Sequence, residues 1–228
     1  MKISPKKSLG QNFLKDKKIL NQIVSLGGIG ENDTVIEVGP GTGNLTEEIL
    51  KKKPKSLTLI EKDINLVKDL KIKFSEDKKI KIFNKDILDF DLEGLVKDKA
   101  IIFGNLPFNI SSQILVKIIK FKNWEPKFKD LIFMFQKELG EKILGKYKTK
   151  NYSRISILTS YRLQSRKEFL VSENCFFPKP KVTSIVIHFK PKKNKFFNIK
   201  NISTLEKVTN ILFSNKRKMI NKNIKKIL

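Results

Sequence analysis

The sequence is poor in the residues that build disulfides and metal sites. It holds one cysteine, Cys175, and one histidine, His188, in 228 residues. A single cysteine excludes an intrachain disulfide, and these two side chains are too few for a zinc site, so we expect no bound metal. No apolar run approaches the roughly 20 residues that cross a membrane, and the N-terminus lacks the apolar segment of a signal peptide. We therefore expect a cytoplasmic protein.

Acidic residues are scarce beside basic ones. The chain carries 48 Lys and Arg against 23 Asp and Glu, a net charge of +25. Self-repulsion of this size favours a polyanionic partner, and nucleic acid is the first to consider. A basic membrane-surface protein would need a Lys-rich amphipathic helix or a lipidation signal, and neither is evident. An AT-biased genome also enriches lysine, so sequence motifs are needed to decide whether the charge indicates nucleic-acid binding.

Short apolar segments alternate with amphipathic ones along the chain. The periodicity predicts helices behind a cap at Asp16 and at residues 44–52, 64–74, 110–121 and 137–144, and strands at 33–39, 56–61, 79–86, 99–105 and 130–136. Two further β segments, around 167–172 and 181–190, lie close enough in sequence to form an antiparallel edge pair. The alternation predicts an α/β protein with a doubly wound, mostly parallel, Rossmann-like sheet.

We expect two parts in the chain. Residues 1–190 would form the sheet domain, led by a flexible basic arm at 1–15, and residues 191–228 a small helical appendage that contacts RNA. The appendage has apolar residues at helical spacing, such as Val208, Ile211 and Leu212, but too few to fold alone. We expect the protein to be a monomer.

A glycine-rich loop follows the first predicted strand of the sheet. The segment "EVGPGTGNLTEEI" places its glycines where a parallel strand turns into a helix, the edge at which α/β sheets bind ligands, although a plain glycine turn would look similar. Glu61 ends the second strand, where it can accept ribose hydroxyls, and Asp86 ends the third, where it can accept an adenine amino group. Each acid alone would more often be a helix cap or a surface charge. Together they predict a nucleoside site at Gly39, Gly41, Gly43, Glu61 and Asp86.

The glycine spacing narrows the choice of cofactor. A dinucleotide prefers GxGxxG, whereas this loop has GxGxG with Glu37 before it. The sulfonium and amino groups of S-adenosylmethionine are cationic, so a nearby carboxylate favours that nucleoside. We predict S-adenosylmethionine as the cofactor, with a NAD-dependent oxidoreductase as a distant alternative.

The segment "FGNLPFNIS" places a rigid turn at the end of the fourth strand. The Asn105 side-chain carbonyl and the Leu106 backbone carbonyl, freed by Pro107, can accept both hydrogens of an adenine N6 amino group. Phe108 can stack on that base, which must be unpaired or flipped to enter. The alternative is an ordinary Asn/Pro turn with a core phenylalanine. Phe177 is either a second stacking wall or a core or rim aromatic.

The remaining basic segments suggest contacts with RNA. The arm "KKSLGQNF" is expected to fold over cofactor and base, with a plain basic tail as the alternative. The loop "KYKTKNYSR" and the terminal "NKRK" supply phosphate contacts that carry no sequence code, unless they are only solvated faces. His188, Trp124 and Met134 are interpreted as structural. The predicted RNA-binding residues are Lys146, Lys148, Lys150, Arg154, Lys216, Arg217 and Lys218.

Several segments together resemble one family. "KSLGQNFLKD", "VIEVGPGTGNLTEEIL", "LIEKD", "NKDIL", "FGNLPFNIS", "FFPKPKVTSIVIHF" and "LFSNKRKMI" occur in the order of the ribosomal RNA adenine dimethyltransferases of the KsgA type, from residue 6 to about 222. The resemblance implies transfer of two methyl groups from S-adenosylmethionine to N6 of each of two adjacent adenosines. These would lie in the 3′-terminal stem-loop of 16S rRNA, in the assembling small ribosomal subunit. It places cofactor contacts at Asn12, Leu14, Gly39, Glu61, Asp86 and Asn105, and the catalytic stretch at Asn105, Leu106, Pro107 and Phe108.

Two departures and two alternatives accompany this resemblance. Phe108 replaces the commoner tyrosine and must stack without a hydroxyl, and the chain ends sooner after "LFSNKRKMINKNIKKIL" than the family usually does. The nearest alternative is the Erm type of resistance methyltransferase, which modifies an adenosine of 23S rRNA by the same chemistry. The other is a non-catalytic RNA-binding or assembly factor, or a mitochondrial transcription factor, on the same fold. The set of Glu61, Asp86 and Asn105 argues for an enzyme.

Overall fold

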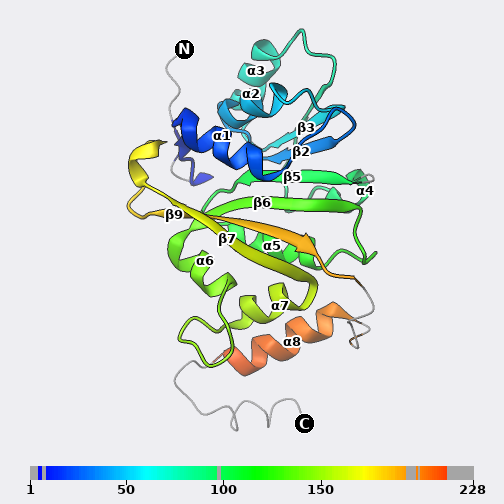
Figure 1. The fold of residues 1–228 in the computed structure, drawn as a ribbon, viewed down its shortest axis with the longest axis vertical. Coiled ribbons are helices and arrows are strands. Elements are labelled where there is room, and N and C mark those ends of the chain that lie inside the picture. Colours follow the sequence, from blue (N-terminus) through cyan, green and yellow to red (C-terminus); the bar gives the residue numbers. More distant parts are fainter. Residues whose placement is uncertain (1–4, 7–8, 97–98, 194–198, 200, 215–228) are drawn as a thin grey trace.

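The computed structural model describes residues 5–6, 9–96, 99–193, 199 and 201–214. Its large sheet has the strand order β4-β3-β2-β5-β6-β9-β7 (Figure 1). These strands are β2 (Thr34–Val38), β3 (Ser56–Glu61), β4 (Ile80–Asn84), β5 (Ala100–Asn105), β6 (Phe128–Gln136), β7 (Leu163–Val171) and β9 (Ser184–Pro191). A separate small sheet pairs β1 (Phe13–Leu14) with β8 (Phe176–Phe177).

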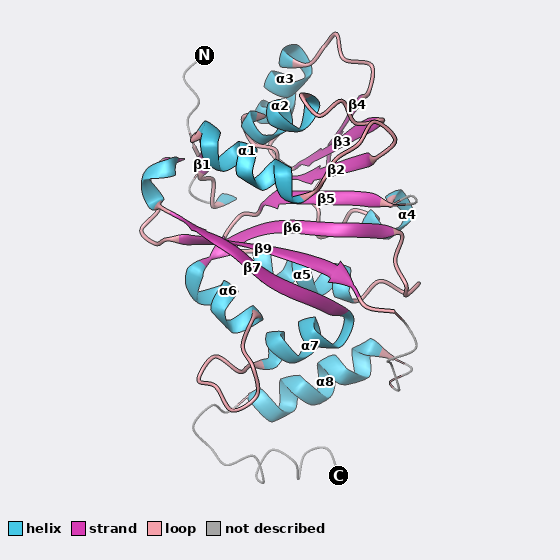
Figure 2. Ribbon diagram, viewed as in Figure 1, coloured by secondary structure: helices cyan, strands magenta, loops and turns pink. Residues whose placement is uncertain are grey.

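Helices connect and cover the strands. They are α1 (Lys17–Leu26), α2 (Asn44–Leu50), α3 (Ile64–Lys73), α4 (Leu92–Leu95), α5 (Ser111–Ile119), α6 (Lys137–Ile143), α7 (Arg154–Arg162) and α8 (Ile202–Phe213), with a 3-10 turn η2 at Glu173–Cys175. Leu20 of α1 and Leu45 of α2 pack on one face of the sheet. Ile114 of α5 and Leu158 of α7 pack on the other. Figure 2 shows the resulting layers, helices on both faces of a twisted sheet.

The strand pairings confirm the predicted fold class. β2, β3, β4, β5 and β6 run parallel, and β9 pairs antiparallel with both β6 and β7. The core strands read as continuous apolar runs because neighbouring residues face opposite layers: Ile101 packs in one cluster and Ile102 in the other. The predicted boundaries are mostly within two residues. β7, however, begins at Leu163, four residues before the predicted segment.

Sequence periodicity missed α7 and the β1–β8 pair. Residue Arg154 was assigned to a loop, and the structure makes it the first residue of α7. The buried side of α7 includes Ser156, Thr159 and Arg162, and these polar residues hide the apolar period that identifies a helix. β1 and β8 have two residues each, too short for any alternation to be visible.

α8 lies against α7 at the end of the molecule opposite α3 (Figure 1). Its buried residues are Ile202 and Thr209, and its Glu206 forms an ion pair at 2.7 Å with Lys120, the residue after α5. The division of the chain at residue 190 stays a prediction. In the described ranges, no helix is long and apolar enough to span a bilayer.

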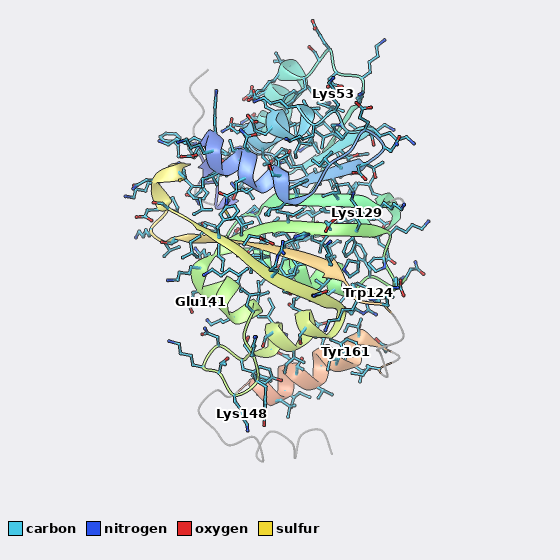
Figure 3. The ribbon with its side chains drawn as sticks, in the orientation of Figure 1. Lys53, Trp124, Lys129, Glu141, Lys148 and Tyr161 are labelled. Atoms are coloured by element: carbon cyan, nitrogen blue, oxygen red, sulfur yellow. The ribbon has the colours of Figure 1, made fainter. Side chains whose placement is uncertain are left out.

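A buried arginine ties α7 to the end of α5. Arg162 Nη1 donates to the carbonyl oxygens of Ile119 and Phe121 at 2.6 and 2.7 Å, where α5 leaves its last carbonyls without helical partners. The guanidinium stacks 4.6 Å from the centre of the Trp124 ring, and burial lowers the pKa of Arg162. Trp124 in turn donates to the Lys192 carbonyl at 2.9 Å (Figure 3 labels this tryptophan). This contact fixes the far end of the helix that begins beside the Asn105 turn.

Replacement of this arginine tests how much the contact stabilises. We expect Arg162→Ala to lower the free energy of unfolding by about 2 kcal/mol, because two buried carbonyls lose a charged donor. Arg166→Ala is the control, since the Arg166 side chain is 71% exposed, and should change stability by less than about 0.5 kcal/mol. Urea denaturation measures both, and equal losses would contradict the assignment.

Candidate active site

The cavity of interest lies where the strand order reverses. From β2 the chain builds β3 and β4 on one side and then returns to β5 on the other, so the loops after β2 and β5 leave in opposite directions. Ligands of open α/β sheets bind at such a switch point, at the carboxyl ends of the strands. A cavity of about 240 Å³ opens there, lined by residues that follow β2, β3, β4 and β5 and covered by residues 9–14.

The glycine loop gives this cavity its floor. Gly39, Gly41 and Gly43 all have positive φ angles, at 69°, 57° and 79°, which other residues rarely adopt. A Cβ on Gly41 would meet the Phe13 ring at 2.8 Å. On Gly39 it would lie 3.8 Å from Pro107 and 3.9 Å from the Asn105 carbonyl, in the gap between loop and turn. The loop is therefore a cradle whose space any side chain would reduce.

Gly43 does not line the cavity, although it was predicted to bind the cofactor. It forms the N-cap of α2, and a Cβ there would meet Phe74 and Leu70 of the α3 region at 2.9 and 3.0 Å. A glycine is needed here because of the positive φ angle and because α2 begins close to the side chains of Leu70 and Phe74.

Two buried carboxylates lie beneath the glycine loop. Glu61 Oε2 accepts from the Gly41 N–H at 3.2 Å and Oε1 from the Asp63 N–H at 2.9 Å. Burial raises the pKa of Glu61, and these hydrogen bonds partly offset it. Glu37 accepts the Thr46 hydroxyl at 2.6 Å, and burial raises its pKa to about 7. The floor thus holds acidic groups that a cation would help to ionise.

Asp86 differs because it is firmly ionised. Lys62 Nζ donates to its Oδ2 at 2.6 Å and the Leu88 N–H to its Oδ1 at 2.9 Å, and the lysine contact is the main cause that lowers the Asp86 pKa. Each oxygen retains a further lone pair. Asp86 lines the cavity at the end of β4, as its position in the sequence predicts.

The N-terminal arm closes over the opening. Asn12 and Leu14 line the cavity, and their carbonyl oxygens accept from the Asn105 and Asn44 side chains at 3.1 and 2.7 Å. β1 pairs Phe13 with Phe177 and Leu14 with Phe176, which fastens the arm to a segment 160 residues away. Residues 9–14 therefore cover the cavity, and contact of the arm with a cofactor and a base stays a prediction.

Asp63 is a further site residue that sequence reasoning missed. Its Oδ1 accepts from Lys6 Nζ at 2.8 Å and its Oδ2 from Gln11 Nε2 at 3.1 Å, so both oxygens hold the arm. It also caps α3 through the Asn65 N–H. The only signal in the sequence was an acid two residues after Glu61 at the start of a helix.

The Asn105 turn forms the wall opposite the glycine loop. Asn105, Leu106, Pro107 and Phe108 all line the cavity. The Asn105 side-chain nitrogen donates to Asn12, which directs Oδ1 the other way. Within the described residues no hydrogen bond ends on this oxygen or on the Leu106 carbonyl. Two oxygens able to accept are therefore held on one short turn.

The predicted second stacking residue and the described RNA-binding residues lie outside the cavity. Phe177 is 56% exposed and lies beside Phe13, so it flanks the covering arm and does not line the cavity. Lys146, Lys148 and Lys150 are exposed in the loop between α6 and α7, and Arg154 Nη1 donates to Asn210 at 3.3 Å. Lys216, Arg217 and Lys218 lie outside the described residues. Met134, interpreted as structural, is buried and also lines the cavity, whereas the ring of Trp124 packs against the core.

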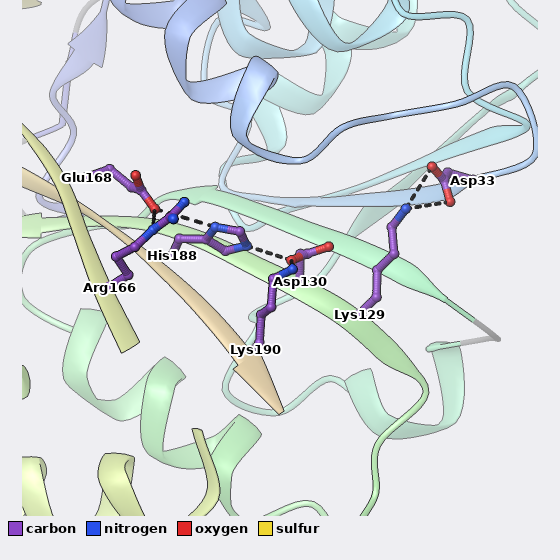
Figure 4. Close-up of polar contacts among 7 residues, drawn as sticks. All are labelled: Asp33, Lys129, Asp130, Arg166, Glu168, His188 and Lys190. Atoms are coloured by element: carbon purple, nitrogen blue, oxygen red, sulfur yellow. Dashed lines mark hydrogen bonds and ion pairs between the residues drawn. The ribbon is translucent and has the colours of Figure 1, made fainter. Parts of the chain in front are cut away.

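His188 belongs to a separate polar network on β6, β7 and β9. Figure 4 shows it between Asp130, at 2.6 Å from Nε2, and Glu168, at 3.5 Å from Nδ1. Arg166 donates to Glu168 at 2.7 Å, and Lys190 lies 3.6 Å from Asp130. None of these side chains lines the cavity. Within the described part of the chain, no group of His, Cys, Asp and Glu side chains could hold a metal ion.

Comparison with known proteins assigns the family. Residues 3–228 match the family model described as ribosomal RNA adenine dimethylase. The chain belongs to this family. One curated relative, the Ribosomal RNA small subunit methyltransferase A of Pelagibacter ubique (strain HTCC1062), is 46% identical over 97% of this chain and 83% of its own length. The protein of the same name from Wolbachia sp. subsp. Drosophila simulans (strain wRi) is 40% identical over 99% and 82%.

Solved structures of related enzymes share the fold. A dimethyladenosine transferase from Plasmodium falciparum has a TM-score of 0.80 and 29% identity, over 93% of this chain and 74% of that one. The 23S rRNA methyltransferase ErmE has a TM-score of 0.73 and 23% identity, over 94% and 84%. At that identity ErmE supports the fold alone. The family match confirms the resemblance drawn from the motifs and the prediction of a methyltransferase.

Glu37 makes stability fall as pH rises. Its pKa is about 7 in the folded protein against an ordinary 4.5, so the folded state keeps a proton that the unfolded chain releases. The free energy of unfolding is therefore highest below the lower pKa, falls between the two values and is level above the higher one. Between pH 5 and 8 we expect the wild type to lose about 2 kcal/mol relative to Glu37→Gln. Urea denaturation at both pH values measures the difference.

The matched control for this experiment is Glu47→Gln. Glu47 is on α2, next to the Thr46 that donates to Glu37, but its side chain is 47% exposed and forms an ion pair with Lys73 at 2.8 Å. Its pH curve should run parallel to that of the wild type. A Glu37→Gln curve parallel to the wild type would show that Glu37 is ionised throughout this range.

Proposed function

We propose that this protein transfers methyl groups from S-adenosylmethionine to N6 of two adjacent adenosines in the 3′-terminal stem-loop of 16S rRNA. The observation that carries the proposal is the pair of acceptors at Asn105 and Leu106, which face a cavity built on a glycine loop. Family membership and relatives named for the small ribosomal subunit support the same substrate. With such a substrate, we infer that the protein acts in the cytoplasm.

The cavity residues fit S-adenosylmethionine by their chemistry. Glu61 has lone pairs for ribose hydroxyls, and Asp86 can accept from an adenine amino group. The open cradle at Gly39 leaves room for the methionine part, and Glu37 supplies a carboxylate beneath it. When bound, this cofactor supplies a methyl group on a positively charged sulfur. The acidic floor would stabilise that charge.

The turn would position the base that receives the methyl group. Asn105 Oδ1 and the Leu106 carbonyl accept the two N6 hydrogens, which orients the nitrogen lone pair towards the methyl group. In the transfer, N6 would bond to the methyl carbon as the bond from that carbon to sulfur breaks, and N6 would then release a proton to water or to these acceptors. Phe108 stacks on the base, and Phe177 would add a second wall at the rim.

The direct experiment is mass spectrometry of small-subunit RNA after incubation with the protein and labelled S-adenosylmethionine. We expect dimethyladenosine at two adjacent positions of the small-subunit RNA and none on free 23S RNA. Labelling of 23S RNA would favour the Erm-type alternative. Cofactor binding without labelling of either RNA would favour a non-catalytic factor.

A substitution in the turn separates catalysis from binding. We expect Asn105→Ala to lower methyl transfer at least about 100-fold, because one of the two acceptors that orient the attacking amine is lost. Cofactor affinity should fall only about fivefold, since the lost hydrogen bond to Asn12 merely loosens the covering arm. Calorimetry and the labelling assay measure the two effects. Asn21→Ala, on an exposed position of α1, should leave both unchanged; lost binding with intact turnover would refute the assignment.

A further inference from the structure

The loop between α6 and α7 exposes a large aromatic side chain. Tyr147 is 73% exposed, a fraction shared among the large hydrophobic side chains of the described residues only with Ile72. A single exposed hydrophobic side chain is common on protein surfaces, so exposure alone indicates no function. The surroundings of Tyr147 are what favour a binding role.

Hydrogen bonds fix the shape of this loop. Thr149 donates to the Lys146 carbonyl through its N–H at 3.0 Å and its hydroxyl at 2.7 Å, and the Tyr152 N–H donates to Thr149 at 3.1 Å. Gly145 allows the two ends to meet closely, because a Cβ there would clash with the Asn151 carbonyl. The loop is therefore built before any partner arrives, which lowers the entropic cost of binding.

An aromatic series supports the exposed ring from below. The Tyr147 ring meets Tyr152 edge to face, with centroids 5.8 Å apart and an angle of 81°. Tyr152 meets Phe213, the last residue of α8, at 6.1 Å. Tyr147 is 73% exposed despite these contacts, so most of its ring surface is open to a planar ligand. Lys148 Nζ lies over the Tyr147 ring, 5.6 Å from its centroid, and adds a positive charge there.

All charged residues close to Tyr147 in the sequence are basic. Residues 145–154 contain Lys146, Lys148, Lys150 and Arg154 and no acidic residue. All three lysines are exposed. A flat aromatic ring among lysines combines the two features that bind single-stranded nucleic acid: a stacking surface and contacts to phosphate.

A second hollow shares one lining residue with the cavity. Leu88 lines both the cavity and this groove of about 410 Å³ between α5, α7 and α8, which includes Arg154 at the end of the loop. This groove is lined by Lys117, Lys120 and Arg154, with Glu206 paired to Lys120. Figure 1 shows the loop on the side of the molecule where the parallel strands end, and Figure 3 labels Lys148 there. One RNA strand could therefore reach both.

We propose that Tyr147 stacks on an unpaired base of the RNA whose adenosine enters the cavity, while Lys146, Lys148 and Lys150 bind the flanking phosphates. The inference rests on the proposed function for the identity of the RNA. The base must be unpaired because a base inside a duplex is already stacked on both faces. Since every base has a π-face, the contact adds affinity and register without sequence specificity.

Binding measurements without methyl donor test the stacking. The probes are an RNA stem-loop with unpaired bases and a fully paired duplex of equal length, measured by fluorescence anisotropy. We expect Tyr147→Ala to bind the stem-loop roughly tenfold more weakly and the duplex unchanged, and Tyr147→Phe to match wild type within about twofold. Ile72→Ala, equally exposed on α3, is the control and should bind as wild type.

The lysines are tested by salt dependence. Replacing Lys146, Lys148 and Lys150 together by alanine should reduce the slope of log affinity against log salt by about two units, since each phosphate contact contributes roughly 0.7 to 0.9. The exposed lysines Lys68, Lys71 and Lys78, replaced together, serve as the control for net charge. Equal slope changes in both variants would overturn the phosphate contacts.

The outcomes separate this inference from the proposed function. Unchanged stem-loop affinity in Tyr147→Ala, with active methyl transfer by the wild type, would overturn the stacking alone. Equal weakening for stem-loop and duplex would also overturn it. If Tyr147→Ala bound whole small subunits more weakly but free RNA normally, the loop would contact a ribosomal protein and the stacking on RNA would be overturned. Absent methyl transfer by the wild type would overturn the proposed function and not this affinity test.

Discussion

The parallel pairing of β2 with β5 is the constraint on which the site depends. Val38 lies opposite Gly104, so the glycine loop and the Asn105 turn leave the sheet side by side. Gly104 keeps the turn tight, because a Cβ there would meet the Leu106 side chain at 2.5 Å and Phe133 at 3.2 Å. A shift of this register would move the acceptors of the turn away from the glycine loop, whatever the remaining residues were.

In this basic protein the lysines are mostly on the surface, whereas two acidic residues are buried below the cavity. The net charge of +25 is on a surface rich in lysine, whereas Glu37 and Glu61 are buried beneath the glycine loop. Burial raises the pKa values of both acids, which disfavours their ionised forms. A cationic ligand in the cavity would favour the ionised forms and would be attracted by them. Meanwhile exposed lysines attract the phosphates of RNA over a longer range. One chain can thus favour a cation inside and a polyanion outside.

What the sequence could predict was local. Strand ends at Glu61 and Asn105 follow from apolar runs that stop, and the glycine loop follows from its spacing. Contacts between distant segments were not visible: Lys6 meets Asp63 across 57 residues, and Phe13 pairs with Phe177. The same limit explains why the role of Gly43 was not predicted, since its neighbours Leu70 and Phe74 are brought to it by the packing of α3. α7 was missed for another reason: its buried side chains are partly polar, so the sequence shows no apolar period.

The side-chain amide of Asn105 links the covering arm to the turn after β5. Its nitrogen can only donate and its oxygen can only accept, so the bond to the Asn12 carbonyl fixes which end faces the cavity. An aspartate could not make that bond, because its carboxylate has no hydrogen to give and would repel a carbonyl. The arm is held separately by Asp63 through Lys6 and Gln11. The position of the covering arm and the direction of the Asn105 oxygen therefore depend on the same hydrogen bond, which explains why an amide stands at the end of β5.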